Sequence, residues 1–432
     1  MSDQVFVIGP DPFNRERLER IAEQAGVTVH PLLRYEDVRG ERYPLDDLLA
    51  RAEAQLRAAD SPPDALAGFW DFPVSDMVPI LCRRLGLRGP SLEAVVRCED
   101  KYWSRLEQRK VIPDCVPRFA RFDPFADDPR AQIELDFPFW IKPIKAWRSQ
   151  LGFHIRDEAG LREAVTVIRA HIERLSEPFN ELLAHLDLPL GIPGGEGGFC
   201  IAEEIIGGHQ CTLEGYSLDG EVTIYGIVDS IRYANETTFS RYQYPSHLPQ
   251  GVQARLIAKA EAVVAFLGLD NTTFNIEFFY DDKRDRTWLL EINPRISQSH
   301  SDLFEKVDGY SNLRILMDVA RGRIPQRRPG AGEAACAAKY FLRRFEDARV
   351  AAVPGPEDIA RLRQAVPGAE VEIEVAPGMR LSDLADQDSY SYELGFVFVG
   401  ADDQRQLLER IRLCEELLTF DLRPTEEGDH GR

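Results

Sequence analysis

Two acidic residues in one short segment offer the clearest chemistry in this chain. In TTFNIEFFYDDKRDRTWLLEINPR (272–295), Glu277 and Glu291 each lie within an apolar run, and DDKRDR between the runs supplies a turn. Two strands paired across that turn can bring the carboxylates side by side. A carboxylate among Ile, Leu and Phe side chains is costly to bury unless a cation neutralises it. The segment therefore predicts a divalent cation between Glu277 and Glu291.

Asn293 and Arg295 extend this candidate site. Strand side chains alternate with period two, so Asn293 lies on the face of Glu291 and offers its amide oxygen. Mg²⁺ keeps few protein ligands and fills its shell with phosphate oxygens and water, so this set suits a nucleotide-bound Mg²⁺, with Mn²⁺ as a substitute, better than Ca²⁺. The planar guanidinium of Arg295 could hold a transferred phosphoryl group or an acyl phosphate. The structural alternative is a Glu and Arg ion-pair network at a sheet end.

The elements around these residues predict α/β units. The first hundred residues alternate apolar strands, VFVIG (5–9), VTVHPL (27–32) and ALAGFW (65–70), with helical stretches, as is typical of a parallel sheet. FPFWIKP (137–143) predicts a strand that ends in Lys142, and Asp157 could cap the helix that follows. Residues 176–198 hold Pro and Gly clusters and predict a long exposed insertion or lid.

The second half of the chain is rich in strands. FCIAEEII, CTLEGYSL, VTIYGIV, TTFNIEFFY and TWLLEIN predict an antiparallel sheet with helical cover. The covering helix is expected to bury one apolar stripe, made of Val252, Leu256, Ala260, Val263 and Phe266. The Pro, Gly and Arg stretch at 321–333 separates a final unit with strands near 336–342, 370–375 and 391–399 and a last helix over 407–418.

Composition narrows the class of protein. A net charge of −20 over 432 residues disfavours nucleic-acid binding, because phosphate backbones are held by clusters of Lys and Arg. The seven cysteines show no CxxC pair, so neither a disulfide framework nor a zinc site is expected. No basic and apolar leader and no apolar stretch of about 20 residues occurs, which favours a cytoplasmic protein without a membrane span.

With these residues in hand, the sequence resembles the ATP-grasp superfamily. Members share an Mg²⁺ site of the form E, a spacer, then E-x-N-P/T-R, matched here by Glu277, Glu291, Asn293, Pro294 and Arg295. DKYWSRLEQRKVIPDCVPRF (100–119), FPFWIKP and IAEEIIGGHQCTLEGYSLDGEV (201–222) resemble further family segments in the same order. The favoured branch is that of the carboxylate-amine (thiol) ligases, related to L-amino acid ligases, D-alanine-D-alanine ligase and biotin carboxylase.

The resemblance implies an α/β fold with α+β character in the grasp. Four parts are expected: an N-terminal Rossmann-like pre-ATP-grasp domain (1–100), a small lid subdomain of the grasp (101–205), a large grasp subdomain with an antiparallel sheet and the Mg²⁺ site (206–325), and a C-terminal α+β unit (334–432).

The resemblance also implies which residues bind the nucleotide. Lys101 and Lys142 would neutralise the α- and β-phosphates as point charges, although a lysine at a strand end is usually solvated. The backbone of the loop at Ser149, Gln150 and Gly152 would cradle phosphate oxygens. This loop reads PIKAWRSQLGF and lacks the other glycines that several relatives carry.

The segment after residue 200 resembles the hinge that meets adenine. There Glu203 would accept a proton from the adenine amino group, and the backbones of Glu204 and Ile206 would read the ring edge. A charged strand end is the alternative for Glu203. Glu214 stands where many relatives carry an acidic residue and is assigned to the nucleotide site.

Two positions near Arg295 concern the second substrate. Ser299 stands where biotin carboxylase carries a glutamate base, which makes bicarbonate chemistry less favoured. His300 could orient a substrate or take a proton from an amine, because neutral imidazole is a suitable base, while a packed structural histidine is the alternative. Arg232, Arg241 and Tyr242 could contact a substrate carboxylate.

Together these features predict an ADP-forming, ATP- and Mg²⁺-dependent ligase that couples a carboxylate, activated as an acyl phosphate, to an amine such as an amino acid or small peptide. One alternative is a carboxylase or carbamoyl-phosphate-type enzyme that uses bicarbonate. Another is a non-catalytic nucleotide-binding regulator. Small-molecule substrates are expected as partners, and dimers are common among relatives, so a homodimer is an open alternative. The sequence does not identify the acid or the amine.

Overall fold

A computed structural model of the chain describes residues 2–40, 43–146, 151–186, 197–233, 238–384 and 391–424. The chain divides into two compact units. The first contains residues 1–226, 248–298 and 313–325, and the second contains residues 227–247, 299–312 and 326–432. This is a coarser division than the four expected parts, whose boundaries stay predictions.

The first unit begins with the predicted parallel sheet. Its strands run in the order β2 (Val27–Leu32), β1 (Asp3–Ile8), β3 (Ala65–Ala67), and both pairings are parallel. The accompanying helices are α1 (Pro12–Ala25), α2 (Tyr35–Val38), α3 (Leu45–Ala58), α4 (Val74–Leu85) and α5 (Leu92–Glu99). The strands are short apolar runs buried under these helices, as expected for a parallel sheet.

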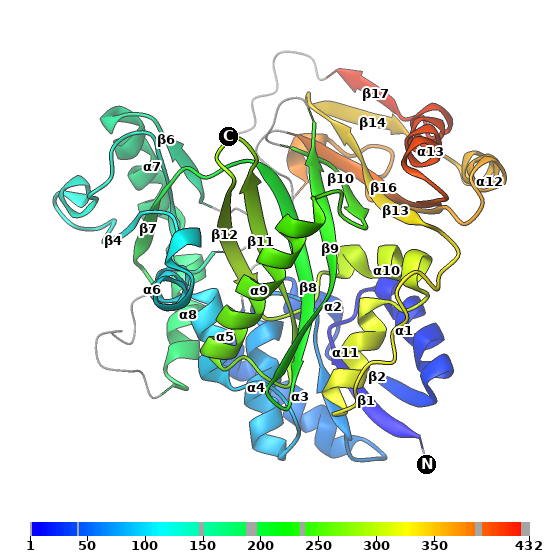
Figure 1. Ribbon diagram of the computed structural model, residues 1–432, viewed down its shortest axis with the longest axis horizontal. Helices are drawn as coiled ribbons and strands as arrows, with labels where there is room; N and C mark the ends of the chain where they lie inside the picture. The colour runs from blue at the N-terminus through cyan, green and yellow to red at the C-terminus, as the bar shows by residue number, and fades with distance from the viewer. Residues whose placement is uncertain are drawn as a thin grey trace. The chain divides into compact units, whose positions relative to one another are not determined.

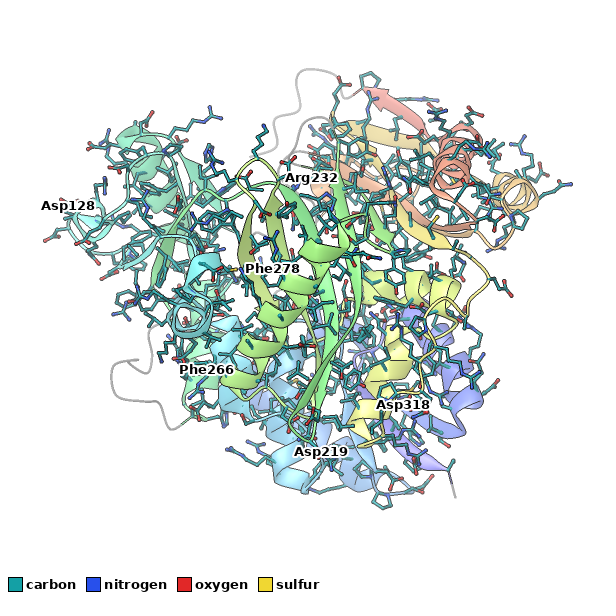
Figure 2. The ribbon with its side chains drawn as sticks, viewed as in Figure 1. Asp128, Asp219, Arg232, Phe266, Phe278 and Asp318 are labelled. Carbon is teal, nitrogen blue, oxygen red and sulfur yellow. The ribbon has the colours of Figure 1, made fainter. Side chains whose placement is uncertain are left out.

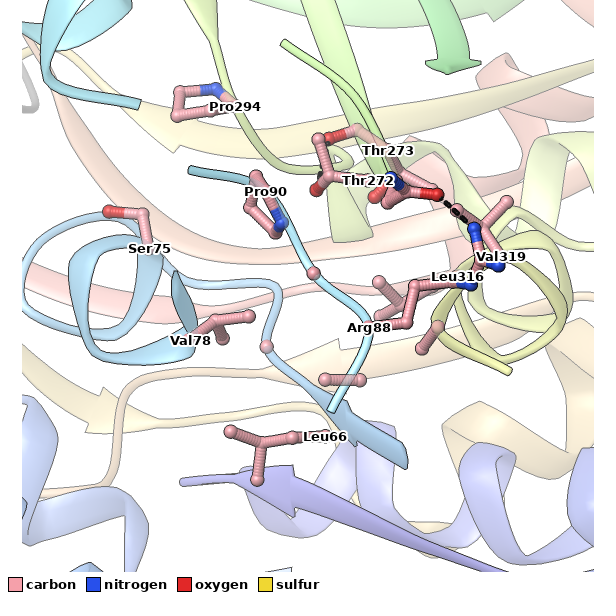
Figure 3. A pocket seen from close by; sticks show the side chains of 15 residues that line it. Leu66, Ser75, Val78, Arg88, Pro90, Thr272, Thr273, Pro294, Leu316 and Val319 are labelled. Carbon is pink, nitrogen blue, oxygen red and sulfur yellow. Dashed lines mark hydrogen bonds between the residues drawn. The ribbon is translucent and has the colours of Figure 1, made fainter. Parts of the chain in front are cut away.

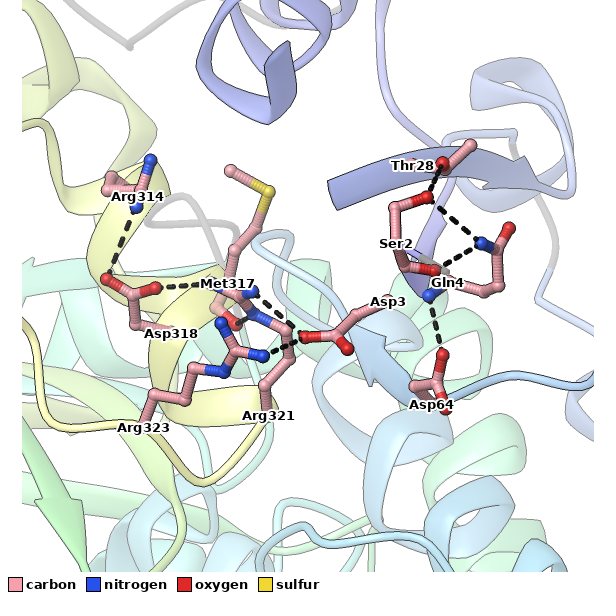
Figure 4. A network of polar contacts seen from close by, with 10 residues as sticks. All are labelled: Ser2, Asp3, Gln4, Thr28, Asp64, Arg314, Met317, Asp318, Arg321 and Arg323. Carbon is pink, nitrogen blue, oxygen red and sulfur yellow. Dashed lines mark hydrogen bonds and ion pairs between the residues drawn. The ribbon is translucent and has the colours of Figure 1, made fainter. Parts of the chain in front are cut away.

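Ion pairs fasten the first strand to a helix from much later in the chain. Asp3 accepts hydrogen bonds from Arg321 (3.1 Å) and Arg323 (2.5 Å), which follow α11 (Asn312–Ala320) (Figure 4). Arg321 also pairs with Asp318, a residue of α11, at 2.5 Å. The contacts join residues more than 300 positions apart, so they hold the amino-terminal sheet within the first unit.

A second, antiparallel sheet in the first unit has the order β4 (Phe119–Phe122), β7 (Cys200–Glu204), β5 (Phe139–Pro143), β6 (Phe153–Ile155). Its helices are α6 (Lys101–Val111) and α7 (Glu158–His171), with short helical turns η1 (Pro113–Cys115) and η2 (Pro129–Gln132). The side chain of Asp157 caps α7 by accepting from the backbone N–H of Gly160, as predicted.

The prediction of a long exposed insertion or lid at 176–198 is partly wrong. Residues Glu173–Leu183 form a helix, α8, and Leu175, Phe179, Leu182 and Leu183 are buried in the core of the first unit. Pro178 lies inside the helix and hid its period from the sequence. Residues 187–196 of the expected insertion lie outside the described residues.

The sheet that carries the predicted metal residues has the order β12 (Arg286–Asn293), β11 (Thr272–Asp281), β8 (His209–Leu218) within the first unit. β9 (Glu221–Arg232) follows β8 and continues into the second unit. Alternation gives this sheet two unlike faces. One is apolar, with Leu213, Phe274, Ile276 and Phe278, and the other carries Thr212, Glu214, Asn275, Glu277 and Glu291.

Helix α9 (Gln250–Leu267) lies across β8 and β11 (Figure 1) and packs against β8. Four members of its expected stripe are buried, but Phe266 is 46% exposed and points outward (Figure 2). The buried stripe continues instead through Val264 and Leu267, which keep the i, i+4, i+7 spacing from Ala260.

The second unit confirms the three strands expected in the final segment. The strand order is β9, β10 (Phe239–Tyr244), β13 (Cys336–Arg344), β16 (Tyr392–Ala401), β15 (Glu370–Ile373). The remaining elements are η3 (Gln298–His300), α10 (Ser301–Asp308), α12 (Pro356–Ala365), η4 (Leu381–Asp383), α13 (Gln404–Leu417) and the pair β14 (Ala348–Ala352) and β17 (Asp421–Pro424). Within the described residues, every helix is too short or too polar to cross a bilayer.

Candidate active site

The two predicted metal carboxylates lie directly opposite each other. In the antiparallel pair of β11 and β12, Glu277 pairs with Glu291 and Asn275 pairs with Asn293. Directly paired positions share one face of a sheet, with Cβ atoms about 5 Å apart. The hairpin thus places Glu277, Glu291 and Asn293 on the polar face, as the alternation of the sequence predicted.

A chain of amide hydrogen bonds orients Asn293. Its Nδ2 donates to Oδ1 of Asn275 at 3.0 Å, and Nδ2 of Asn275 donates to the carbonyl of Arg295 at 3.0 Å. Because the nitrogen of Asn293 is occupied, its amide oxygen is turned away from Asn275. The carboxylate of Glu277 is held in turn by Gln210, whose Nε2 donates to Oε2 at 2.8 Å. Such outer partners fix the direction of metal ligands.

These donors fit a hard cation. All three offer oxygen, which Mg²⁺ prefers, and one oxygen from each would leave half of an octahedral shell for phosphate and water. Among the described residues no group of three or more His, Cys, Asp or Glu side chains is arranged for a metal.

Lys101 lies beside this hairpin. It is the first residue of α6, and its Nζ donates to the carbonyl of Ala146 at 2.6 Å. Desolvation lowers the pKa of Lys101 to about 8, Glu291 and Glu203 oppose that shift, and Lys142 strengthens it. The charge of Lys101 thus interacts with Glu291 of the hairpin and with Glu203 of the expected hinge.

Lys142 is ion-paired rather than solvated. Its Nζ lies 2.7 Å from Oε2 of Glu203, and its side chain is 20% exposed. Oε1 of Glu203 accepts from Nε of Arg105 at 2.6 Å. Burial alone would raise the pKa of Glu203, but Arg105 and Lys142 outweigh it and lower the pKa to about 2. Glu203 is therefore an anchor for two cations, which gives it a role that the adenine assignment did not include.

Arg105 ties three elements together. From α6 it reaches Glu203 on β7, and its Nη1 and Nη2 donate to the carbonyls of Leu289 and Leu290 on β12, each at 2.8 Å. The side chain is 4% exposed. Sequence reasoning missed it, although Arg105 follows Lys101 by four residues and so lies on the same helical face.

The other two residues of the expected hinge, Glu204 and Ile206, were assigned through their backbone groups. The backbone N–H of Glu204 donates to the carbonyl of Arg118 at 2.9 Å, so that N–H is already used in strand pairing. Ile206 lies in the loop between β7 and β8. Of the two backbones expected to read adenine, Ile206 is the one outside the sheet.

Glu214 is buried within the polar face. Its Oε2 accepts from the hydroxyl of Tyr225 at 3.1 Å, and its Oε1 accepts from the backbone N–H of Ser297 at 3.0 Å. Glu214 also acts electrostatically on Arg295. These bonds secure the segment that follows Arg295, which is a positioning role.

Arg295 is held by a residue that the sequence did not single out. Its Nε and Nη2 both lie 2.6 Å from Oδ1 of Asp71, which follows β3. Burial alone would lower the pKa of Arg295, but Asp71 outweighs it and raises that pKa above its usual range, with Glu291 adding to the effect. A carboxylate just after a buried strand was the only signal in the sequence for Asp71.

A small pocket lies beside this region of the first unit (Figure 3). Its wall includes Gly68 after β3, Ser75 at the start of α4, Thr273 at the start of β11, and Pro294. Arg88 donates to Asn271 at one side, at 2.5 Å. The lining is mostly apolar and lacks the lysines and the glutamate pair.

Other predicted residues lie outside this cluster. Ser149 and Gln150 fall outside the described residues, and Gly152 lies just before β6. His300 belongs to the second unit, where it is buried against Tyr242 with ring centroids 5.1 Å apart. In the same unit Nζ of Lys339 donates to the hydroxyl of Ser299 at 3.1 Å.

Comparison with known proteins identifies the architecture. Residues 135–301 match the ATP-grasp domain family. No curated protein sequence matches the chain. An L-amino acid ligase from Bacillus licheniformis superimposes with a TM-score of 0.73 at 16% identity, covering 98% of this chain and 99% of that one.

Two further solved structures have the same fold. A biotin carboxylase from Campylobacter jejuni gives a TM-score of 0.68 at 14% identity over 97% of this chain and 92% of that chain. An N5-carboxyaminoimidazole ribonucleotide synthetase from Thermotoga maritima gives 0.63 at 16% identity over 97% and 99%. At these identities the likeness is one of fold.

Proposed function

The chain carries an ATP-grasp domain at residues 135–301, and from this premise we propose that it is an ATP- and Mg²⁺-dependent ligase. It joins a carboxylate, activated as an acyl phosphate, to an amine, and it releases ADP and phosphate. The L-amino acid ligase with the same fold supports an amino acid or small peptide as substrate. No nucleic acid and no membrane takes part in this reaction.

The observation that carries the proposal is the hairpin register. Glu277 faces Glu291, and the amide of Asn293 is turned by Asn275 so that its oxygen is available. An ordinary ion-pair network does not require two strand carboxylates in direct register, because like charges opposite each other are destabilising. Glu277 and Glu291 would hold a cation, whose positive charge would remove that cost.

The residues of the chain divide the chemistry among them. Glu277, Glu291 and Asn293 would hold Mg²⁺, which would neutralise phosphate oxygens of bound ATP. Lys101 and Lys142 add positive charge along the phosphates, and Glu203 with Arg105 keeps Lys142 in place. Phosphoryl transfer asks for positioning and charge neutralisation more than for covalent catalysis by the protein.

Two steps follow. An oxygen of the substrate carboxylate forms a bond to the γ-phosphorus while the bond from that phosphorus to the bridging oxygen of ADP breaks. The amine nitrogen then bonds to the acyl carbon, and phosphate leaves with the electron pair of the broken C–O bond. Arg295 is placed to stabilise the negative charge of both stages.

Replacing Glu291 by Gln tests the metal assignment. The variant keeps the shape of the side chain but loses the negative charge that would bind the metal. ATP turnover should therefore fall at least about a hundredfold, as it does when one strong electrostatic contact to a transition state is lost. ADP release measured over a range of Mg²⁺ concentrations is the assay. A variant with a near-normal rate and an unchanged fold would refute the assignment.

Bicarbonate is the second candidate acceptor, supported by the fold shared with biotin carboxylases. Ser299 at the position of their glutamate base weighs against it. An ADP-release screen with amino acids singly and in pairs, and with bicarbonate, separates the two. Condensed products found by mass spectrometry support the ligase. ADP release that depends on bicarbonate supports the carboxylase, and ATP binding without ADP release would support a non-catalytic regulator.

A further inference from the structure

Asp71 occupies the place where open parallel sheets bind ligands. In the strand order β2, β1, β3, the chain adds β2 on one side of β1 and β3 on the other. Crevices at the carboxyl ends of parallel strands are common binding sites where the strand order switches in this way. Asp71 follows β3 by four residues, next to Trp70, whose Nε1 donates to the carbonyl of Gly9 at 2.8 Å. Gly9 directly follows β1, so this bond fixes the segment before Asp71 to the end of the neighbouring strand.

The two oxygens of Asp71 differ in their partners. Oδ1 accepts a hydrogen bond from Nε of Arg295 at 2.6 Å and forms an ion pair with Nη2 of Arg295 at 2.6 Å. Within the described residues no group donates a hydrogen bond to Oδ2, and the side chain of Asp71 is 27% exposed. One half of the carboxylate thus holds the arginine, and the other half keeps its acceptor capacity.

Asp71 is ionised at neutral pH. Burial alone would raise its pKa, but Arg295 outweighs burial and lowers it, with smaller contributions from Lys145 and Arg39. Asp71 is therefore a carboxylate and a poor proton acceptor. An anionic oxygen with spare capacity in a partly buried site suits a cationic donor.

We propose that Asp71 selects the acceptor amine: Oδ2 binds the ammonium group of the incoming substrate while Oδ1 anchors Arg295. This inference rests on the proposed ligase function. The proposed contact favours a primary ammonium group over bicarbonate or a neutral nucleophile. The carboxylate of Asp71 would then lie between this ammonium group and the guanidinium of Arg295, which holds the acyl phosphate. The substrate class is a primary amine that is protonated in solution, such as the α-ammonium group of an amino acid.

The proton balance of the second step follows from this assignment. The bound ammonium must lose one proton before its nitrogen can attack, and the resulting amide nitrogen loses a second one. The departing phosphate takes up one of these protons, and the other is released to solvent. Asp71 binds the cation and takes neither proton, in keeping with its low pKa.

Hydroxylamine and glycinamide distinguish this role from mere support of Arg295. Hydroxylamine is largely uncharged at neutral pH and traps an acyl phosphate as a hydroxamate, whereas glycinamide is a cationic amine without a carboxylate. Each is supplied with ATP, Mg²⁺ and the standard amino acids as carboxylate donors. The variants are Asp71→Asn, Asp71→Glu and, as a control, Asp60→Asn, which alters an exposed aspartate of the same domain.

In Asp71→Asn the KM for glycinamide should rise about tenfold to a hundredfold, the loss expected for one charge-assisted hydrogen bond. Hydroxamate formation should fall much less, and Asp71→Glu should restore part of the glycinamide affinity. Asp60→Asn should match the wild type. Parallel losses with both nucleophiles, or an unchanged KM for glycinamide, would overturn the inference while leaving the ligase proposal intact. A wild-type protein that forms neither ADP nor hydroxamate would overturn both.

Discussion

Replacing Glu203 by Gln tests how the site holds its lysine and arginine. Glu203 is 5% exposed and accepts from Arg105 and Lys142. Its pKa falls from 4.5 to about 2 because the two cations outweigh burial, which corresponds to roughly 3 kcal/mol of stability at neutral pH. Breaking a buried ion pair by removing one partner costs about 3–5 kcal/mol, in the same range. We expect the first compact unit to lose roughly 3 kcal/mol in this variant.

The expected pH dependence has a definite sign. Because the folded pKa of Glu203 lies below the unfolded one, its stabilisation is fully present above pH 4.5 and is lost as the pH falls through about 2. The difference between wild type and Glu203→Gln should therefore be largest near neutral pH and shrink towards about pH 2.

Urea unfolding followed by tryptophan fluorescence measures this difference. All five tryptophans of the sequence belong to the first unit, so the signal reports on the unit that contains Glu203. Glu204→Gln is the matched control, because Glu204 is one residue away, 34% exposed and 3.6 Å from Arg118. It should cost about 1 kcal/mol or less. Equal stability of Glu203→Gln and wild type at neutral pH, or a difference that persists at pH 2, would refute the reasoning.

Two further predictions concern the metal ligands and the thiols. Asn275→Ala removes the acceptor that orients Asn293, so kcat/KM for ATP should fall about tenfold to a hundredfold at limiting Mg²⁺; an unchanged Mg²⁺ dependence in a folded variant would contradict this. All seven cysteines are free and buried, and burial raises the pKa of Cys82 to about 12, so a thiol reagent should modify them only after unfolding. Rapid modification of the native protein would contradict the burial.

The hairpin shows what local sequence could predict about the site. Apolar runs on both sides of DDKRDR predicted the hairpin, and the period of two predicted that Asn293 shares the face of Glu291. A register shift between Glu277 and Phe278 then brings Glu277 opposite Glu291. The register shift beside Glu277 was not predicted, whereas the hairpin and the alternation are short-range properties. The same holds for α9, whose stripe was predicted up to its last turn.

The sequence failed where local signals were interrupted. Pro178 and the nearby glycines pointed to an exposed insertion, whereas four apolar side chains of α8 are buried in the core of the first unit. Tertiary packing stabilises this helix, because the buried apolar area outweighs the cost of a proline inside it. The strands β14 and β17 were not predicted either, since each gains its partner from a residue range about 70 positions away.

The sequence by itself predicted the residue types of the proposed metal site, the polar face that they share and the resemblance to the ATP-grasp fold. Only the tertiary structure showed that Asp71 holds Arg295 across 224 positions and that Arg105 and Glu203 join across 98. The reason is physical: alternation and helical period act over a few residues, whereas an ion pair between distant segments depends on how separate elements pack. The residues that hold and aim the reactive groups were therefore found in the fold rather than in the motif.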